Sequence, residues 1–235
     1  MNGIPQIPET GDEMVFANIV ALSEALNTAT RCLARRENDA GFAQMIHVME
    51  VLAVFLQAFS ESKHAVYSDA EELGVVPCPM QCIAEDPGQV FPCPFLVGPL
   101  PRKANIGGIL SALSACAAYN LGIACQVESF VPSDYHRCEQ FRLQSRRFYK
   151  TAYDLLDRLS YISPDGTLIH VYMALCTNLA EIAFGEADLD ASRKWRSALR
   201  DTLGCIPEDK SCVVYKHFHN TSLFYLFDIP AAPAA

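Results

Sequence analysis

The side chains of this sequence that could bind a metal ion or act as nucleophiles include ten cysteines and six histidines. Cys78, Cys82 and Cys93 share one proline-rich stretch, and two of them stand inside Pro-Cys-Pro triplets. Structural zinc sites use four ligands, usually in closely spaced pairs. Only Cys78-x3-Cys82 forms such a pair here, with His64 or His136 as a remote fourth ligand. We therefore favour unligated thiols and expect no metal and no other cofactor.

The histidines do not indicate a reaction. His217 and His219 stand two residues apart, which places them on different faces of a helix, whereas metal-binding pairs need a spacing of three or four. His47 and His170 lie among apolar residues at helical spacing, where a histidine is more often a hydrogen-bonded core residue than a catalyst. Catalytic triads are defined by geometry rather than by spacing, so no catalytic residue is assigned and an enzyme is the less favoured class.

Two sets of basic side chains recur at helical spacing and could bind an acidic partner. They are Arg142, Arg146 and Lys150 with the neighbouring Arg147, and Arg193, Arg196 and Arg200. Acidic residues lie beside both sets, so a solvated face of mixed charge is the favoured interpretation.

Composition narrows the class of partner and the compartment. Hydrophobic residues make up 51% of the 235 residues and charged residues 19%, so general disorder is excluded. The formal net charge of -9 would repel a phosphate backbone, so no nucleic acid is expected. The first residues lack the regions of a secretory signal peptide, which together with the cysteines favours reduced thiols in the cytoplasm or nucleus. The most apolar stretch, Met45 to Phe59, is shorter than the roughly 20 residues that cross a bilayer, so no membrane is expected.

The elements that must position these residues are mainly helices. Apolar residues at alternating steps of three and four predict an N-terminal helical pair in residues 1–73, and its second helix is apolar on several sides. A helix of that kind is expected inside the fold. Residues 74–106 are predicted to form a proline-rich extended strap, because seven of the fourteen prolines fall there and interrupt the helical period.

Helical spacing returns in residues 107–227, with predicted helix starts at Ser163-Pro164 and at Asp188, and residues 228–235 are predicted to be a flexible tail. The predicted fold class is therefore all-α.

Two segments of residues 107–227 share a pattern of residue sizes. The first has Tyr119-Asn120-Leu121-Gly122 on one helix, then Ser145, Tyr149 and Ala152 on the next; the second has Thr177-Asn178-Leu179-Ala180, then Ala191, Trp195 and Ala198. The small residue lets the paired helix approach, and the aromatic residue fills the space between hairpins. This pattern resembles the tetratricopeptide repeat (TPR), which implies antiparallel helical hairpins stacked as a short TPR-like α-solenoid with the proline-rich extended strap as an insertion.

The order of helical pair, strap and Asn-Leu hairpins is also similar to that of uncharacterised TPR-like proteins of microalgae, a resemblance that implies no known activity. A plain helical bundle is the alternative arrangement.

The TPR resemblance implies a non-enzymatic scaffold or adaptor that binds a partner peptide or helix on a concave surface formed by the first helix of each hairpin. The side chains predicted to line that surface are Tyr119, Ile123, Gln126, Val127, Thr177, Glu181 and Phe184. This set is apolar and weakly acidic, and Ile123 and Glu181 stand where a carboxylate-binding member of the family has asparagines. An apolar peptide or helix is therefore the expected partner.

Two alternatives remain open at this point. In the first alternative, the strap or the last helix fills the concave surface, and the predicted binding residues are then part of the core. In the rival function, the protein is a helical enzyme or small-ligand carrier whose pocket is enclosed by the N-terminal helices and the strap.

Overall fold

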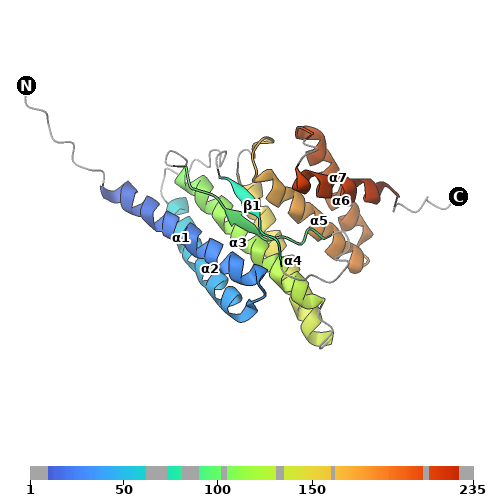
Figure 1. Ribbon diagram of the computed structural model, residues 1–235, viewed down its shortest axis with the longest axis horizontal. Helices are drawn as coiled ribbons and strands as arrows, with labels where there is room; N and C mark the ends of the chain where they lie inside the picture. Colours follow the sequence, from blue (N-terminus) through green and yellow to red (C-terminus); the bar gives the residue numbers. More distant parts are fainter. Residues whose placement is uncertain are drawn as a thin grey trace, which may run out of the picture.

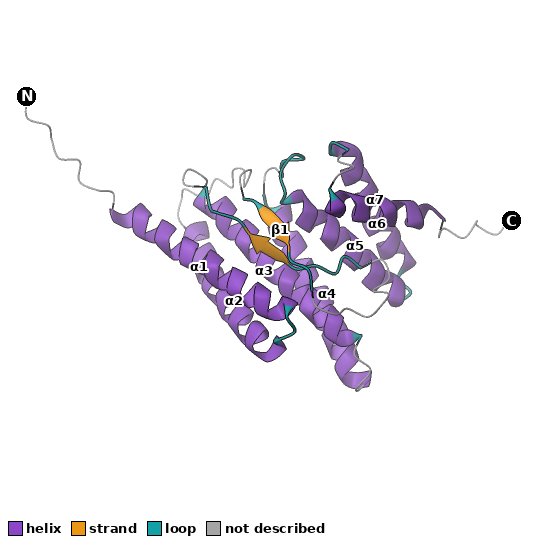
Figure 2. Cartoon of the chain, in the orientation of Figure 1, coloured by secondary structure: helices purple, strands orange, loops and turns teal. Residues whose placement is uncertain are grey.

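The computed structural model describes residues 10–61, 73–80, 90–101, 105–130, 135–159, 162–208 and 212–227. These residues form seven α-helices and one small two-stranded sheet (Figure 1). The helices are α1 (Thr10–Ala34), α2 (Asn38–Glu61), α3 (Ile106–Ser129), α4 (Tyr135–Asp157), α5 (Ile169–Gly185), α6 (Leu189–Cys205) and α7 (Val213–Phe227). The strands are β1 (Val75–Pro77) and β2 (Phe95–Val97). The described chain is predominantly helical, which confirms the predicted all-α class (Figure 2).

The helices pack as consecutive pairs, α1 with α2, α3 with α4 and α5 with α6, and α7 packs against α5 and α6. The turns that follow α1 and α5 have the same geometry. Arg36 and Ala187 adopt positive φ angles of 62° and 60°. In each turn the next residue donates its N–H to the carbonyl five positions earlier, over 3.0 Å for Glu37 and 2.9 Å for Asp188. A left-handed residue with this hydrogen bond ends a helix and reverses the chain.

The close approach of α3 and α4 depends on Gly122. A Cβ atom at this position would lie 2.5 Å from the Tyr149 ring, which is far inside van der Waals contact. The Tyr149 side chain is fully buried. The expected pairing of a small residue with a large aromatic residue is therefore present at this crossing.

The α3–α4 and α5–α6 hairpins share one contact, in which a serine on the second helix bonds to a backbone carbonyl of the first helix. Ser145 Oγ on α4 donates to the carbonyl of that glycine over 2.8 Å, and Ser192 Oγ on α6 donates to the carbonyl of the corresponding alanine on α5 over 3.0 Å. The structural counterpart of Ser145 is thus Ser192, one residue after the Ala191 that the sequence pattern aligned with it. The alignment of Trp195 with Tyr149 shifts accordingly, and Trp195 is only partly buried.

The innermost helix is α3, and the expectation that the second apolar helix lies inside the fold was wrong. Every residue of α3 from Gly108 to Val127 is buried, whereas α2 packs against α1 and α3 and leaves its outer side exposed. Ile46 and Val54 on α2 are 45% and 67% exposed. The strands and α4 cover α3 from other sides, so apolar content alone did not determine which helix became central. Both helices are long and apolar enough to cross a membrane by length and composition, a test that core helices also pass.

The two strands lie across α3 and pair in antiparallel fashion, with Val75 opposite Val97 and Pro77 opposite Phe95 (Figure 1). We call residues 90–97 the crossing segment. Of the predicted strap, residues 81–89 and 102–104 lie outside the described residues, as do residues 228–235 of the predicted tail.

Candidate functional site

The most regular polar arrangement in the described chain consists of three asparagines, one on the first helix of each hairpin. They are Asn27 on α1, Asn120 on α3 and Asn178 on α5. Asn120 and Asn178 are fully buried, and Asn27 is partly buried. All three amide groups contact the crossing segment.

Each asparagine binds both backbone polar groups of one residue in the crossing segment. Asn27 Oδ1 accepts from Val97 N and its Nδ2 donates to Val97 O, both over 2.7 Å. Asn120 makes the same pair of bonds to Phe95, both over 2.8 Å. Asn178 Oδ1 accepts from Phe91 N over 2.7 Å, and its Nδ2 lies 3.3 Å from Phe91 O.

A side-chain amide has one donor side and one acceptor side, like a peptide group, so an asparagine can occupy the place of a neighbouring strand. The asparagines hold residues 91, 95 and 97 on one edge of the crossing segment. The opposite edge faces β1, where Cys78 N donates to Pro94 O and Gly98 N donates to Gly74 O, each over 2.7 Å. The crossing segment therefore lies as a middle strand between β1 and a row of asparagines.

Neighbouring side chains fix the orientation of these amides. Asn120 Nδ2 donates to Thr30 Oγ1 over 2.9 Å, and that hydroxyl donates to the Leu26 carbonyl over 2.7 Å. Asn178 Nδ2 lies 3.0 Å from the Tyr149 hydroxyl, which donates to Gln126 Oε1 over 2.7 Å. The backbone-binding groups are thus held in place from behind by the helices.

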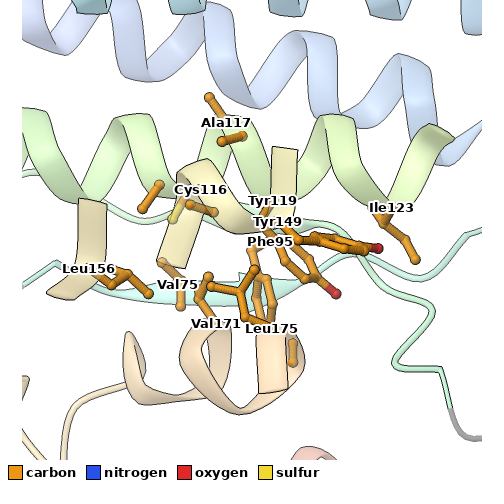
Figure 3. Close-up of a cluster of buried hydrophobic side chains, with 14 of the residues drawn as sticks. Val75, Phe95, Cys116, Ala117, Tyr119, Ile123, Tyr149, Leu156, Val171 and Leu175 are labelled. Atoms are coloured by element: carbon orange, nitrogen blue, oxygen red, sulfur yellow. The ribbon is translucent and has the colours of Figure 1, made fainter. Parts of the chain in front are cut away.

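Aromatic rings surround the side chains of the crossing segment. The Phe95 ring centroid lies 5.3 Å from that of Tyr119, which lies 5.5 Å from that of Tyr149. Figure 3 shows these three rings together between α3 and α5. At the other end, Phe91 packs against Phe218 and His217 of α7, with centroids 4.9 Å and 5.1 Å away. These rings fill the space between the crossing segment and the helices.

Burial keeps the nearby ionisable groups neutral. It raises the pKa of the Tyr119 and Tyr149 hydroxyls above their ordinary value, and it raises the pKa of Cys93 to about 11 and of Cys116 to about 12. A thiol with such a pKa is a poor nucleophile at neutral pH, because the thiolate is the reactive form. The chemistry that this region supports is therefore hydrogen bonding and apolar contact.

The cysteines and histidines considered from the sequence form no group of three or more possible metal ligands within the described residues. Cys82 and His64 lie outside them. Cys78 directly follows β1 and Cys93 lies two residues before β2, and Cys78 N donates to the carbonyl of Pro94, the residue that follows Cys93.

The seven residues predicted to bind a partner separate into two groups. Five are buried: Tyr119, Ile123, Gln126, Val127 and Thr177. The Tyr119 hydroxyl donates to the Phe91 carbonyl over 3.2 Å, so this residue lies directly beneath the crossing segment. These five side chains are not open to a partner in this conformation, and for Tyr119 the crossing segment is the part of the chain that covers the residue.

The other two predicted residues remain accessible at the α5 end. Phe184 is 48% exposed, and Glu181 is partly buried and accepts a 2.9 Å hydrogen bond from the Tyr225 hydroxyl. The Arg196 guanidinium lies over both the Phe184 and Tyr225 rings, 5.2 Å and 4.2 Å from their centroids. Binding of a partner by any of the seven residues stays a prediction.

Sequence reasoning assigned Asn120 and Asn178 to hairpin packing and missed Asn27 altogether. A usable pattern was present, because each asparagine is followed two positions later by a small residue, Ala29, Gly122 or Ala180. Asparagine is also unfavourable inside a helix and is seldom fully buried. Its recurrence at one place in three helices was therefore a sign of a specific contact.

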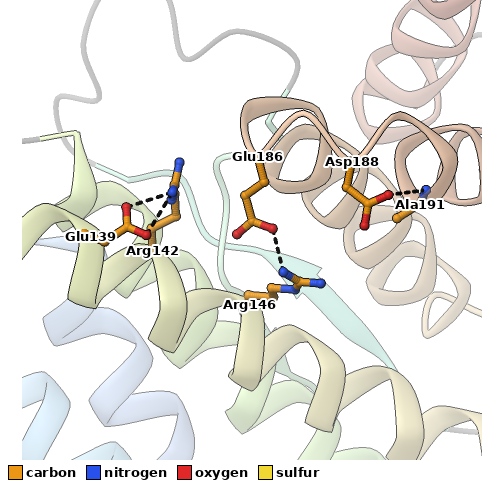
Figure 4. Close-up of polar contacts among 6 residues, drawn as sticks. All are labelled: Glu139, Arg142, Arg146, Glu186, Asp188 and Ala191. Atoms are coloured by element: carbon orange, nitrogen blue, oxygen red, sulfur yellow. Dashed lines mark hydrogen bonds and ion pairs between the residues drawn. The ribbon is translucent and has the colours of Figure 1, made fainter.

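The basic arrays form mixed-charge contacts, as expected. Arg142 pairs with Glu139 over 2.8 Å and Arg146 with Glu186 over 2.5 Å (Figure 4). Lys150 pairs with Asp154 and Arg193 with Asp190. Figure 4 also shows the Asp188 carboxylate accepting from Ala191 N at the start of α6, the cap that the sequence predicts.

Comparison with protein-family models, with curated proteins and with solved structures finds no match to this chain. What the protein does is therefore inferred from its own residues.

Proposed function

We propose that this protein is a non-enzymatic interaction scaffold that holds an extended peptide segment across α1, α3 and α5. The observation that carries the proposal is the row formed by Asn27, Asn120 and Asn178, each bound to both the N–H and the C=O of one residue. Backbone contacts of this kind provide affinity in strand-addition binding, and apolar contacts to alternate side chains provide specificity.

A TPR-like stacking of the hairpins is part of the proposal. It is supported by the matching turns at Arg36 and Ala187 and by the matching serine contacts of Ser145 and Ser192. Stacked hairpins bring the first helix of each pair to a common side, which accounts for the even placement of the asparagines. The strap is then an insertion that enters this side.

The proposed partner is a protein or peptide in the cytoplasm or nucleus. None of the nine cysteines described by the structure forms a disulfide, which fits a reducing compartment. A net charge of -9 disfavours nucleic acid. The three asparagine amides are neutral, so they suit a peptide backbone better than a charged ligand.

The rival function requires a pocket between the N-terminal helices and the strap. Where the strap crosses α3, the Phe95 ring packs against the rings of Phe91 and Tyr119. A surface hollow of about 300 Å³ lies elsewhere, lined by Tyr215 and His219 of α7 and by neighbouring polar residues. This hollow is the place where a small-ligand function would be tested.

Selection from a library of displayed 12-residue peptides tests the proposed function. The bait is the full chain carrying Phe91→Ala, which weakens the contact of the crossing segment with α7. We expect selected peptides whose binding falls at least tenfold when Asn178→Ala is added. The matched control is Asn220→Ala, which alters an exposed asparagine on α7. Recovery of no peptide, or of peptides equally sensitive to both substitutions, would refute the function.

A further inference from the structure

We infer, on the basis of the proposed function, that the crossing segment is a tethered ligand, and that the partner has the same pattern of apolar residues and prolines. The partner would be an extended, proline-containing peptide with apolar residues at its first, fifth and seventh positions, corresponding to Phe91, Phe95 and Val97. It would replace the crossing segment between β1 and the row of asparagines.

The hydrogen bonds determine where proline is allowed. Residues 91, 95 and 97 each donate an N–H to an asparagine, so proline at these positions would remove a bond. Pro92 and Pro94 stand between the bound residues. There the missing N–H makes no difference to the asparagines, while the ring restricts the chain to extended conformations. A peptide with prolines at its second and fourth positions would lose less conformational freedom on binding.

The apolar positions follow from burial. Phe91, Phe95 and Val97 are 4%, 0% and 5% exposed, and Val90 before them is 4% exposed. Leu96 is only partly buried, so the sixth position tolerates a wider range of side chains. Hydrogen bonds from side-chain amides do not depend on the identity of the bound residue. Packing against the surrounding rings does depend on it, at Phe91 and Phe95.

Tethering explains why the surface is occupied in the isolated chain. Attachment to the same chain gives a segment an effective concentration on the order of millimolar. A free peptide that makes the same contacts must therefore approach about millimolar concentration before it replaces the crossing segment. Weakening the tethered segment by one aromatic contact shifts this balance toward the free peptide.

The test measures binding of a fluorescently labelled peptide with the sequence of residues 88–99, carrying serine in place of Cys93. We expect the Phe91→Ala chain to bind it at least about tenfold more tightly than the unaltered chain does. Phe130→Ala, which removes an exposed aromatic side chain at the end of α3, is the matched control and should leave the weak binding unchanged. A second peptide with proline in place of Phe95 lacks an N–H for Asn120 and should bind at least tenfold more weakly.

The proposal is overturned if the Phe91→Ala chain stays helical by circular dichroism yet binds the peptide no better than the unaltered chain. Equal binding of the two peptides also overturns it. If the crossing segment of a second copy of the chain enters in place of the free peptide, domain-swapped dimers will appear on size-exclusion chromatography. The proposed occupant is then wrong.

A second design avoids any loss of folding from the substitution. Protease sites placed in residues 81–89 and 102–104 of the otherwise unaltered chain would free the crossing segment at both ends. We expect the cut segment to exchange with added labelled peptide. Lack of exchange would make the segment a permanent part of the core and refute the inference.

The two proposals can fail separately. Asparagine-dependent binding of library peptides that lack the apolar and proline pattern would leave the proposed function standing and overturn this inference. Exchange of the 88–99 peptide without recovery of any library peptide would refute the proposed function, while the replaceability of the crossing segment by a peptide of its own sequence would stand.

Discussion

Replacement of Asn120 by alanine gives the most direct measurement of how much the asparagine row contributes to stability. Asn120 is fully buried and makes two bonds to the Phe95 backbone and one to Thr30 Oγ1. Alanine would leave the Phe95 N–H and C=O without these partners in a region that water does not reach. The Thr30 hydroxyl keeps its bond to the Leu26 carbonyl, so it adds little to the cost.

The magnitude follows from those two orphaned groups. A buried donor or acceptor left without a partner costs about 1–3 kcal/mol, so Asn120→Ala should lower the free energy of unfolding by about 2–6 kcal/mol. Asn27 makes the same pair of bonds to Val97 but is only partly buried. Water can replace its bonds, so Asn27→Ala should cost only about 1 kcal/mol.

Urea unfolding followed by circular dichroism measures both effects. The unfolding midpoint of the Asn120→Ala chain should fall by about 0.7–2 M, given that the slope for a chain of this size is about 3 kcal/mol/M. Asn220→Ala, an exposed control on α7, should change the free energy by less than about 0.5 kcal/mol. A cost below about 1 kcal/mol for Asn120→Ala, or equal costs for Asn120 and Asn27, would refute the reasoning from buried backbone groups.

Three further outcomes are expected. Gly122→Ala should destabilise the chain by about 1–3 kcal/mol in urea unfolding, because its Cβ would lie 2.5 Å from a buried ring on α4. The control is Gly204→Ala, whose Cβ would have no neighbour within 4 Å, and this change should be neutral or stabilising. Burial lowers the pKa of His217 below its ordinary value near 6.5, so the unfolded chain binds the proton more readily and stability should fall as pH drops below about 6.5. Thermal melting between pH 7.5 and 5.0 checks this, and a His217→Phe chain with an equally steep loss would contradict it. Alkylation at pH 8 with mass-spectrometric detection should modify the exposed Cys205 long before Cys116, whose pKa burial raises to about 12; equal rates would contradict the described burial.

Local features of the fold were predictable from the sequence because they depend on neighbours a few residues apart. The helical period predicted the all-α class, and the Asp188 cap needed only a carboxylate three residues before the Ala191 N–H. The ion pairs of Arg142 with Glu139 and of Lys150 with Asp154 also join residues three or four apart on one helix. Such contacts form wherever the helix forms.

The candidate site was not predictable in the same way. Its hydrogen bonds join Asn27 to Val97, 70 residues apart, and Asn178 to Phe91, 87 residues apart. The sequence predicted that Tyr119 lines the concave surface that binds a partner. Only the path of the crossing segment in the fold determined that Tyr119 contacts Phe91 of the same chain.

The sequence by itself therefore determined that the chain forms amphipathic and apolar helices with close-packing small residues, since periodicity and side-chain size are written in local order. The tertiary structure decided which apolar helix became central, α3 rather than α2, and which polar residues became backbone-binding groups. The physical reason is that several partners could satisfy an apolar face or a buried amide. The choice among them depends on how all the elements pack together.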